Sequence, residues 1–384
     1  MSVPYQTRMS HWLIAWMRAV LTPAWRRAAA VWVGAAIGGG IVFGPTGMHP
    51  HDLTELAHGV PAVGGVLAIT WLLVFTPTAR VLVRAEGARY LRSLPHPRTP
   101  PILIVSVALV VLQLPWLLLW IAGDGARGLV FVIALSIVIA AVAALRLRPR
   151  KVRFPPWTRA YPALRGVYLR ALKRRAGDAL VRGVGLALLA GLAAALVVRN
   201  NGLVGRDAAA LGAGAIAVVL VPGYAGALMP LVEAQRASAW LASSLGMSSA
   251  LRLGVLATVV IGVYFVGTLV AVGALALGFA TLFEGSASAT NETLAWIGAT
   301  GGTCAIGMGL VATRALVVAD RKLAVEDRSL AGAVREVRGA PVQVVSGAVV
   351  ASAVAIACLG WLGVYGAAVA VGIGLVMLLT ARSA

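Results

Sequence analysis

The stretch RLRPRKVRFPPWTRAYPALRGVYLRALKRR, residues 146–175, decides how the rest of the chain is laid out. It contains eleven Lys or Arg residues and no Asp or Glu. On both sides of it the chain is apolar in blocks of roughly 18 to 25 residues, long enough to cross the ~30 Å bilayer core at about 1.5 Å per helical residue. A basic segment between hydrophobic spans stays in the cytoplasm. The stretch therefore sets the orientation of every span around it.

The composition is that of a membrane protein. Of the 384 residues, 60% are hydrophobic and only 12% are charged, whereas soluble proteins carry about 25% charged residues. The net charge of +20 comes from residues that flank apolar spans, as the positive-inside rule requires, so we expect no nucleic-acid partner. The bias towards Ala, Val, Arg and Gly is typical of a high-GC bacterium, which predicts the bacterial cytoplasmic (inner) membrane.

We predict an all-α, polytopic membrane helical bundle of about ten transmembrane helices with both termini cytoplasmic. The predicted spans are approximately 28–46, 61–80, 101–122, 128–146, 180–198, 207–231, 253–281, 294–318, 342–358 and 362–381. The last two form a tight hairpin around Trp361. In this arrangement only Arg127, Arg199 and Arg206 of the 33 Lys and Arg residues lie outside the cell, which is the asymmetry that the positive-inside rule predicts.

Two basic aromatic segments precede the two halves of the chain. In residues 8–27, Trp12, Trp16 and Val20 form a helical stripe, and a second helix places Tyr161, Leu164, Tyr168 and Leu172 on one face. We expect both helices to lie at the inner membrane surface.

The two halves also resemble each other. The inner loops RAEGARYLRSLPHPRTP and EAQRASAWLASSLGMSS resemble one another at an offset of 150 residues. This favours a two-fold repeat of a four-helix unit, as found in some transporters; the alternative is that short charged loops look alike. The predicted domains are 1–150, 151–318 and 319–384.

No Asp, Glu, Lys, Arg or His occupies the middle of a predicted span. Ionisable groups at that depth mark proton and ion pathways, so a proton-coupled or sodium-coupled carrier is disfavoured. The chain contains no GxxxxGK[ST] loop, so it does not bind ATP by that route. We expect no cofactor. An enzyme acting on lipids is disfavoured because no acid–base or nucleophile pair is placed near an interface.

One outer loop, residues 47–60, is unusually rich in histidine. If Asp52 caps a short helix, His51, Glu55 and His58 fall near one face, and two imidazoles with a carboxylate can bind a divalent metal. A solvated loop is the alternative that we favour, so we predict no metal centre.

The inner loop between the second and third spans has the features of a docking helix. It carries Glu86, Arg89, Tyr90 and Arg92 at neighbouring helical positions, followed by Leu94 and Pro95. A short charged helix that ends in proline can dock into a groove of a partner; a solvated loop whose arginines only set topology is the alternative.

These features resemble the membrane subunits of ABC-2-type exporters, in which a basic amphipathic helix leads into the first span and the loop between the second and third spans contacts a separate ATPase. The resemblance implies a partner-coupling role for Glu86, Arg89, Tyr90, Leu94 and Pro95. In the second half it assigns the same role to Glu233, Arg236 and Trp240, although Pro95 has no counterpart there.

The function that we expect is therefore a permease subunit of an ATP-driven exporter, which moves a lipid, a peptide or another amphipathic substrate with energy from a cytoplasmic ATPase subunit. Membrane lipids are the other expected partner, and the oligomeric state stays open. The alternative is a non-transporting scaffold or assembly subunit of a bacterial inner-membrane complex.

Overall fold

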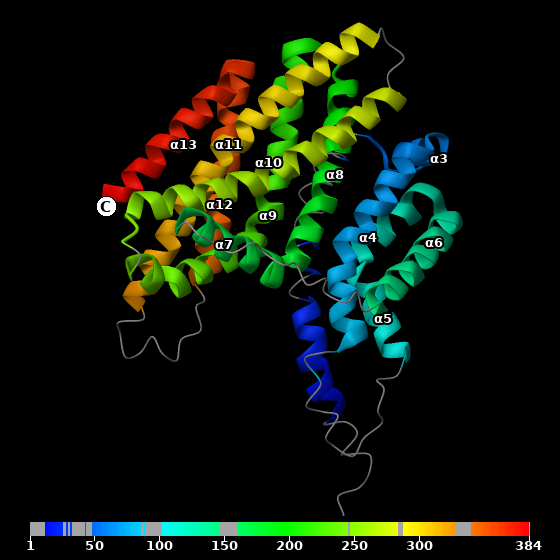
Figure 1. Ribbon diagram of the computed structural model, residues 1–384. Helices are drawn as coiled ribbons and strands as arrows, with labels where there is room; N and C mark the ends of the chain where they lie inside the picture. Colours follow the sequence, from blue (N-terminus) through cyan, green and yellow to red (C-terminus); the bar gives the residue numbers. More distant parts are fainter. Residues whose placement is uncertain are drawn as a thin grey trace, which may run out of the picture. The chain divides into compact units, whose positions relative to one another are not determined.

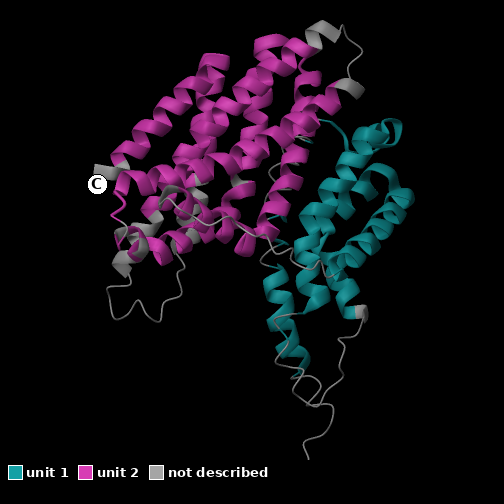
Figure 2. Ribbon diagram, in the orientation of Figure 1, with its two compact units in different colours: residues 1–151 teal, residues 152–384 magenta. Residues whose placement is uncertain are grey.

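A computed structural model gives the fold of the chain (Figure 1). It describes residues 12–25, 28–29, 31–32, 43, 48–85, 88, 102–145, 160–244, 246–282, 287–326 and 339–383. These residues are helical apart from short turns, and none of them forms a β-strand. The chain divides into two compact units, Met1–Lys151 and Val152–Ala384 (Figure 2). We call the helix ends that the charge pattern assigns to the cytoplasm inner ends, and the opposite ends outer ends.

The first unit begins with helical residues 12–25, which include one π-helical turn, η1 (Met17–Leu21). Trp12, Trp16 and Val20 are buried on one face, which confirms the predicted helical stripe. The other helices of this unit are α3 (Pro50–Gly59), α4 (Pro61–Arg84), α5 (Ile102–Leu112) and α6 (Leu114–Ala144). The predicted first span, 28–46, lies almost wholly outside the described residues.

Helix α6 folds back on itself at Gly125, whose φ of +57° is strained for any residue with a side chain. Trp120 and Phe131, on either side of this turn, stack with ring centroids 4.5 Å apart. Farther from the turn, the Ser136 hydroxyl donates to the side chain of Gln113 over 3.3 Å. Residues 114–124 and 126–144 are therefore antiparallel, and the turn lies where the sequence predicts one between the third and fourth spans.

The second unit consists of α7 (Ala160–Arg175), α8 (Gly177–Asn200), α9 (Gly205–Ser244), α10 (Ser249–Leu282), α11 (Ala287–Glu326), α12 (Gly339–Leu362), η3 (Gly363–Tyr365) and α13 (Gly366–Ser383). Helix α9 is central and packs against α8, α11 and α12. It bends by 50° between residues 205–221 and 223–240. The bend lies at Pro222, which cannot donate the helical hydrogen bond at that position and was expected to kink its span.

Small residues let the helices of the second unit approach closely, as is typical of membrane bundles. A Cβ atom on Gly267 of α10 would lie 2.6 Å from the ring of Tyr224 on α9, and one on Gly183 of α8 would lie 2.5 Å from the same ring. Likewise a Cβ on Gly374 of α13 would lie 2.9 Å from the carbonyl oxygen of Gly307 on α11. These glycines are required by packing rather than by backbone conformation.

The C-terminal helices form the predicted hairpin. Gly347 of α12 contacts Ala315 of α11, whereas Ala370 of α13 contacts Gly307 of the same helix. Helix α12 therefore runs antiparallel to α11, and α13 runs parallel to it. The reversal occurs at Gly363, with φ +56°, next to Trp361.

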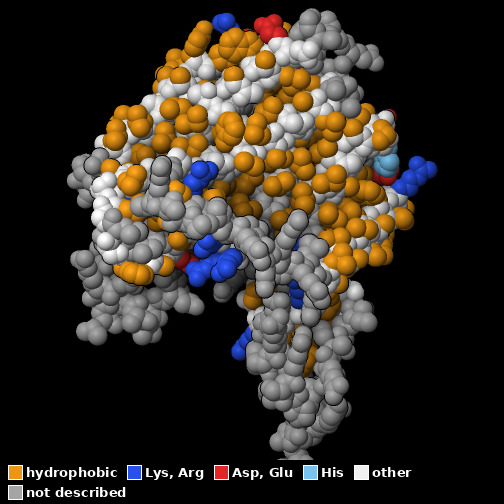
Figure 3. Space-filling view, viewed as in Figure 1, with side chains coloured by type: hydrophobic (Ala, Val, Ile, Leu, Met, Phe, Trp, Pro, Cys, Tyr) orange, Lys and Arg blue, Asp and Glu red, His pale blue; other side chains and the backbone are white. Residues whose placement is uncertain are grey.

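Six helices are long and apolar enough to cross a membrane, or up to seven if the bent α9 counts as one span. Two of the six, Leu114–Ala144 and Val349–Thr380, contain the chain reversals at Gly125 and Gly363. Large apolar side chains are exposed along α6, α10 and α13, among them Val130, Leu269 and Val376. Soluble monomers rarely expose apolar surfaces this large. Figure 3 shows apolar side chains spread over the described part of the visible face. The chain is a multi-pass membrane protein.

Candidate functional site

The first candidate site lies at the inner end of α9. This helix does not stop where the apolar span ends but continues to Ser244, so the prediction that the inner loop EAQRASAWLASSLGMSS, residues 233–249, begins at the end of the span is wrong. The physical reason is that no glycine or proline interrupts the chain between Pro230 and Gly246. At Gly246 the backbone turns with φ +63°, and the Met247 N–H donates to the Ala242 carbonyl over 2.9 Å. This is the glycine-based cap that ends many helices.

Helix α10 starts after a polar residue that caps it. The side chain of Ser248 accepts a hydrogen bond from the Leu251 N–H over 3.3 Å, which is the usual N-terminal cap. The connection between α9 and α10 is therefore short and held at both ends. Residues 232–244 therefore continue α9 as a helix beyond the predicted span, and we call them the projection.

Glu233, Arg236 and Trp240, predicted to couple to a partner, share one face of this projection because they are three and four residues apart. The carboxylate of Glu233 is exposed, and Trp240 exposes 70% of its surface. On the opposite face Ser238 is buried, and its hydroxyl donates to the Ala234 carbonyl over 2.7 Å. The structure thus brings the three predicted residues of the second half together around an exposed indole.

Helix α7 packs beside this projection. Its residues Leu164, Tyr168 and Leu172 are buried, as the sequence pattern predicted, and the helix packs against α9 and α10. At its end the Arg175 guanidinium forms an ion pair with the Glu233 carboxylate of α9. The basic stretch and the predicted coupling residues therefore form one surface. The sequence analysis missed this contact because it joins residues 58 positions apart.

Lys173 and Arg174 of α7 are also exposed and precede the ion-paired Arg175 in the chain. The surface itself combines the Arg175 and Arg236 side chains with the indole of Trp240, and arginine and tryptophan are both enriched where proteins dock.

The coupling residues predicted in the first half, namely Glu86, Arg89, Tyr90, Arg92, Leu94 and Pro95, lie outside the described residues. The end of helix α4, which precedes these residues, is held by hydrogen bonds. The Arg84 side chain at the end of α4 donates to the carbonyls of Ala143 (3.0 Å) and Leu145 (2.5 Å) at the end of α6. A cation at a helix C-terminus stabilises the unpaired carbonyls there. Sequence reasoning treated Arg84 only as a topology signal.

At the outer end of the first unit, the histidine-rich segment forms the short helix α3. Its N-cap residue is His49, and the carboxylate of Asp52, three positions later, accepts the His49 backbone N–H over 2.9 Å. The expectation that Asp52 itself caps the helix is therefore wrong. Pro50 starts the helix three residues earlier than that expectation required.

The three candidate metal ligands do not converge. The Nδ1 atom of His51 lies 2.9 Å from the Gly123 carbonyl oxygen, while the Nε2 atom of His58 faces the Asp124 carboxylate at 3.7 Å. Glu55 is exposed. Within the described part of the chain, no group of three His, Cys, Asp or Glu side chains is arranged to hold a metal ion. The two imidazoles instead fasten α3 to the turn in α6.

Hydrogen bonding to the Gly123 carbonyl is the largest influence on His51 and raises its pKa. Desolvation is the next largest influence and lowers the pKa, whereas the carboxylates of Glu55, Asp52 and Asp124 raise it further.

Comparison of the chain with family models, with curated proteins and with solved structures found no match.

Proposed function

We propose that this chain is the membrane subunit of an ATP-driven exporter of the bacterial inner membrane, with about ten spans and both termini in the cytoplasm. A separate cytoplasmic ATPase would supply the energy, and the substrate would be amphipathic. The observation that carries the proposal is the projection at the inner end of α9, which presents Trp240 beside Glu233 and Arg236. An indole that exposes 70% of its surface on a helix is suited to fill a pocket of a partner.

The position of the arginines supports an energy source outside the membrane. Among the described spans, Arg80, Arg182 and Arg314 each lie within about one turn of the inner end of the predicted span. No Asp, Glu, Lys, Arg or His side chain is described at mid-depth in those spans, where a gradient-driven carrier needs one. Energy for uphill transport would then enter through the inner surface.

The ten-span count rests on the two hairpins. The reversals at Gly125 and Gly363 turn two of the long apolar stretches into two antiparallel helices each. Counted with α4, α8, α9, α10 and α11, these four helices would give nine of the ten proposed spans, and the segment 28–46, which lies outside the described residues, would be the tenth.

The proposal is tested by copurification from the native host. Wild-type chain should retain an ATPase that carries a Walker motif, whereas Trp240→Ala and the double reversal Glu86→Arg with Arg89→Glu should lose it. Trp361→Ala is the matched control, because this indole is exposed at the outer hairpin and should have no effect. Retention of the ATPase by both inner variants, or the absence of any ATPase from the wild-type complex, would refute the coupling surface.

A further inference from the structure

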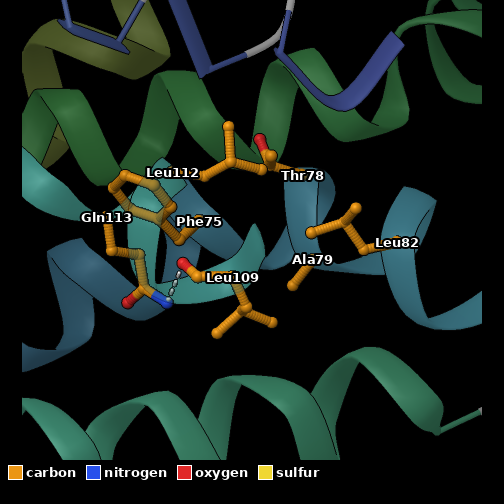
Figure 4. Close-up of a pocket in the computed structure, with 7 residues that line it drawn as sticks. All are labelled: Phe75, Thr78, Ala79, Leu82, Leu109, Leu112 and Gln113. Carbon is orange, nitrogen blue, oxygen red and sulfur yellow. Dashed lines mark hydrogen bonds between the residues drawn. The ribbon is translucent and has the colours of Figure 1, made fainter. Parts of the chain in front are cut away.

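The first unit contains a narrow gap between α4 and α5, whose lining includes Phe75 and Leu109 (Figure 4). The gap has no room for a water molecule, and the Gln113 amide in its lining donates to the Leu109 carbonyl over 3.1 Å. It is therefore too small to hold a ligand. A pair of reactive side chains lies instead in the second unit.

The sequence contains two cysteines, Cys304 on α11 and Cys358 on α12, and both are free thiols in the structure. Cys304 is buried and Cys358 is half-buried. Cys358 precedes the chain reversal at Gly363 by five residues, which is about 8 Å along the helix axis. It therefore lies near the outer end of the C-terminal hairpin.

The contact between Gly347 and Ala315 sets the register of α12 against α11. Gly347 lies against the Cβ atom of Ala315, and the two helices are antiparallel. Cys304 precedes Ala315 by eleven residues, and Cys358 follows Gly347 by eleven residues. Because eleven residues are close to three complete helical turns, each cysteine lies on the same face of its helix as the residue that makes the contact. The two cysteines therefore face each other at one level, about 17 Å farther towards the outer end.

Buried apolar side chains fill the interface between these two levels. Met308 and Val311 continue the face of Cys304 along α11, because they follow it by four and seven residues. Both are buried in one hydrophobic cluster with Cys304 and with Ala351 of α12. Cys358 lies close enough to Cys304 to act on it electrostatically. The packing and this interaction agree with the register.

Helix α9 shows that α11 and α12 stay together at their outer ends. A Cβ atom on Gly212 of α9 would lie 3.5 Å from the side chain of Ile297 on α11. One on Gly214 would lie 3.9 Å from the side chain of Leu359 on α12. Leu359 directly follows Cys358 in the chain, so α12 has not diverged from its neighbours at the level of the cysteines.

We propose that Cys304 and Cys358 form a disulfide bond that fastens the C-terminal hairpin to α11 when the outer side of the membrane is oxidising. Disulfides form and persist in extracellular and periplasmic compartments, and the pair lies towards the outer end. The attachment of the hairpin then depends on the redox state of that compartment. The bond goes beyond the proposed export function, because it depends only on the register of α11 and α12.

The oxidant in this reaction is an external disulfide compound. Cys358 reacts first because it is half-buried, whereas Cys304 exposes only 1% of its surface. The Cys358 thiolate attacks one sulfur of the oxidant, which forms a mixed disulfide and releases one thiolate. Cys304 then gives up its proton, and its sulfur attacks the Cys358 sulfur and releases the second thiolate. Two electrons pass from the cysteines to the oxidant, and the two cysteine protons end on the two released thiols.

The test treats the purified full chain in detergent with oxidised glutathione, which is a soluble disulfide. Free thiols are then alkylated with N-ethylmaleimide in denaturant and counted by intact mass. The oxidised wild-type chain should carry neither maleimide nor glutathione, and after reduction it should carry two maleimides. Its apparent Tm should exceed that of the reduced chain by about 5 °C or more.

Two variants separate the proposed pair from a chance collision. Cys304→Ala should stop at the mixed disulfide between Cys358 and glutathione, because the second thiol is absent. The matched control combines Ala357→Cys with Cys358→Ala, which moves the thiol by about 100° around α12 to an exposed position. The control should accept glutathione and form no internal bond.

Wild-type chain that keeps two free thiols, or that accumulates the glutathione adduct, would overturn the proposal if the control takes up glutathione under the same conditions. An internal bond that forms as readily in the control would also contradict it, because the register would then not select the pair. If Cys304→Ala fails to fold, the wild-type chain and the control still decide the matter. None of these outcomes involves the ATPase, so the proposed export function is tested separately.

Discussion

The Arg175 guanidinium at the end of α7 is ion-paired with the Glu233 carboxylate on the inner half of α9. Through this contact the basic stretch that orients the chain also holds the surface that we propose for docking an ATPase. Both side chains are more than half exposed, so the pair adds little to stability. Its role is then to position one helix against the other.

Charge reversal tests that role. Arg175→Glu and Glu233→Arg should each speed amide hydrogen exchange in α7 and reduce ATP-dependent export, because like charges then face each other. The free energy of unfolding should change by less than about 1 kcal/mol. Combining both reversals should restore export, since the pair is remade with opposite polarity. Lys173→Glu, at an exposed neighbour, is the control. A swapped double variant as defective as either single one would contradict a positioning role.

Accessibility of engineered cysteines tests the topology. In a background without Cys304 and Cys358, Glu55→Cys should react with a membrane-impermeant maleimide in intact cells. Arg174→Cys should react only after permeabilisation. Both positions are exposed on described helices, whereas Thr54 beside the first is buried and unsuited to labelling. Labelling of Arg174→Cys from outside would overturn the whole orientation.

The strength of the contact between His51 of α3 and the Gly123 carbonyl of α6 should depend on pH. The pKa of His51 is raised by the Gly123 carbonyl and by nearby carboxylates, so the folded state binds the proton more tightly than the unfolded state. Its stabilising contribution is therefore full below the ordinary pKa of 6.5 and is lost as pH rises through the raised value.

Nuclear magnetic resonance titration of the imidazole should give a His51 midpoint above 6.5, and Glu55→Gln should lower that midpoint. A midpoint at or below the ordinary value would show that the contact with Gly123 does not form in solution.

Packing around Tyr224 predicts that alanine substitutions at two glycines of α10 differ sharply in their effect on protein stability. Gly267→Ala places a methyl group 2.6 Å from the Tyr224 ring, which has another glycine against its opposite edge. Such overpacking typically costs about 1–3 kcal/mol. Gly262→Ala meets nothing within 4 Å and should be neutral or stabilising, because alanine favours helix. Thermal unfolding in detergent measures both. Equal stability of the two variants would show that the Tyr224 ring is not tightly packed between Gly183 and Gly267.

Much of the fold could be predicted because membrane helices are encoded locally. Apolar length predicted α4, α8 and α10, and turn residues predicted the reversals near Gly125 and Gly363. The continuation of α9 beyond its span was missed because hydropathy reports where the bilayer ends rather than where a helix ends.

The candidate site was predicted less completely. The resemblance to ABC-2-type exporter subunits singled out Glu233, Arg236 and Trp240, which the structure places on one face of α9. It could not reveal that Arg175 pairs with Glu233, or that Arg84 caps α6, because these contacts join distant segments. The contact between the rings of Trp71 and Trp116, whose centroids are 4.0 Å apart, was missed for the same reason, since the two residues lie on separate spans.

The central claim is that energy enters this protein from a separate ATPase at its inner surface. The most direct measurement is uphill movement of a fluorescent short-chain phospholipid across vesicles that contain the purified chain. We predict no accumulation under an imposed pH or sodium gradient when the chain is alone, and ATP-dependent accumulation once the copurified ATPase is added. Gradient-driven accumulation by the chain alone would contradict the claim and identify a secondary carrier.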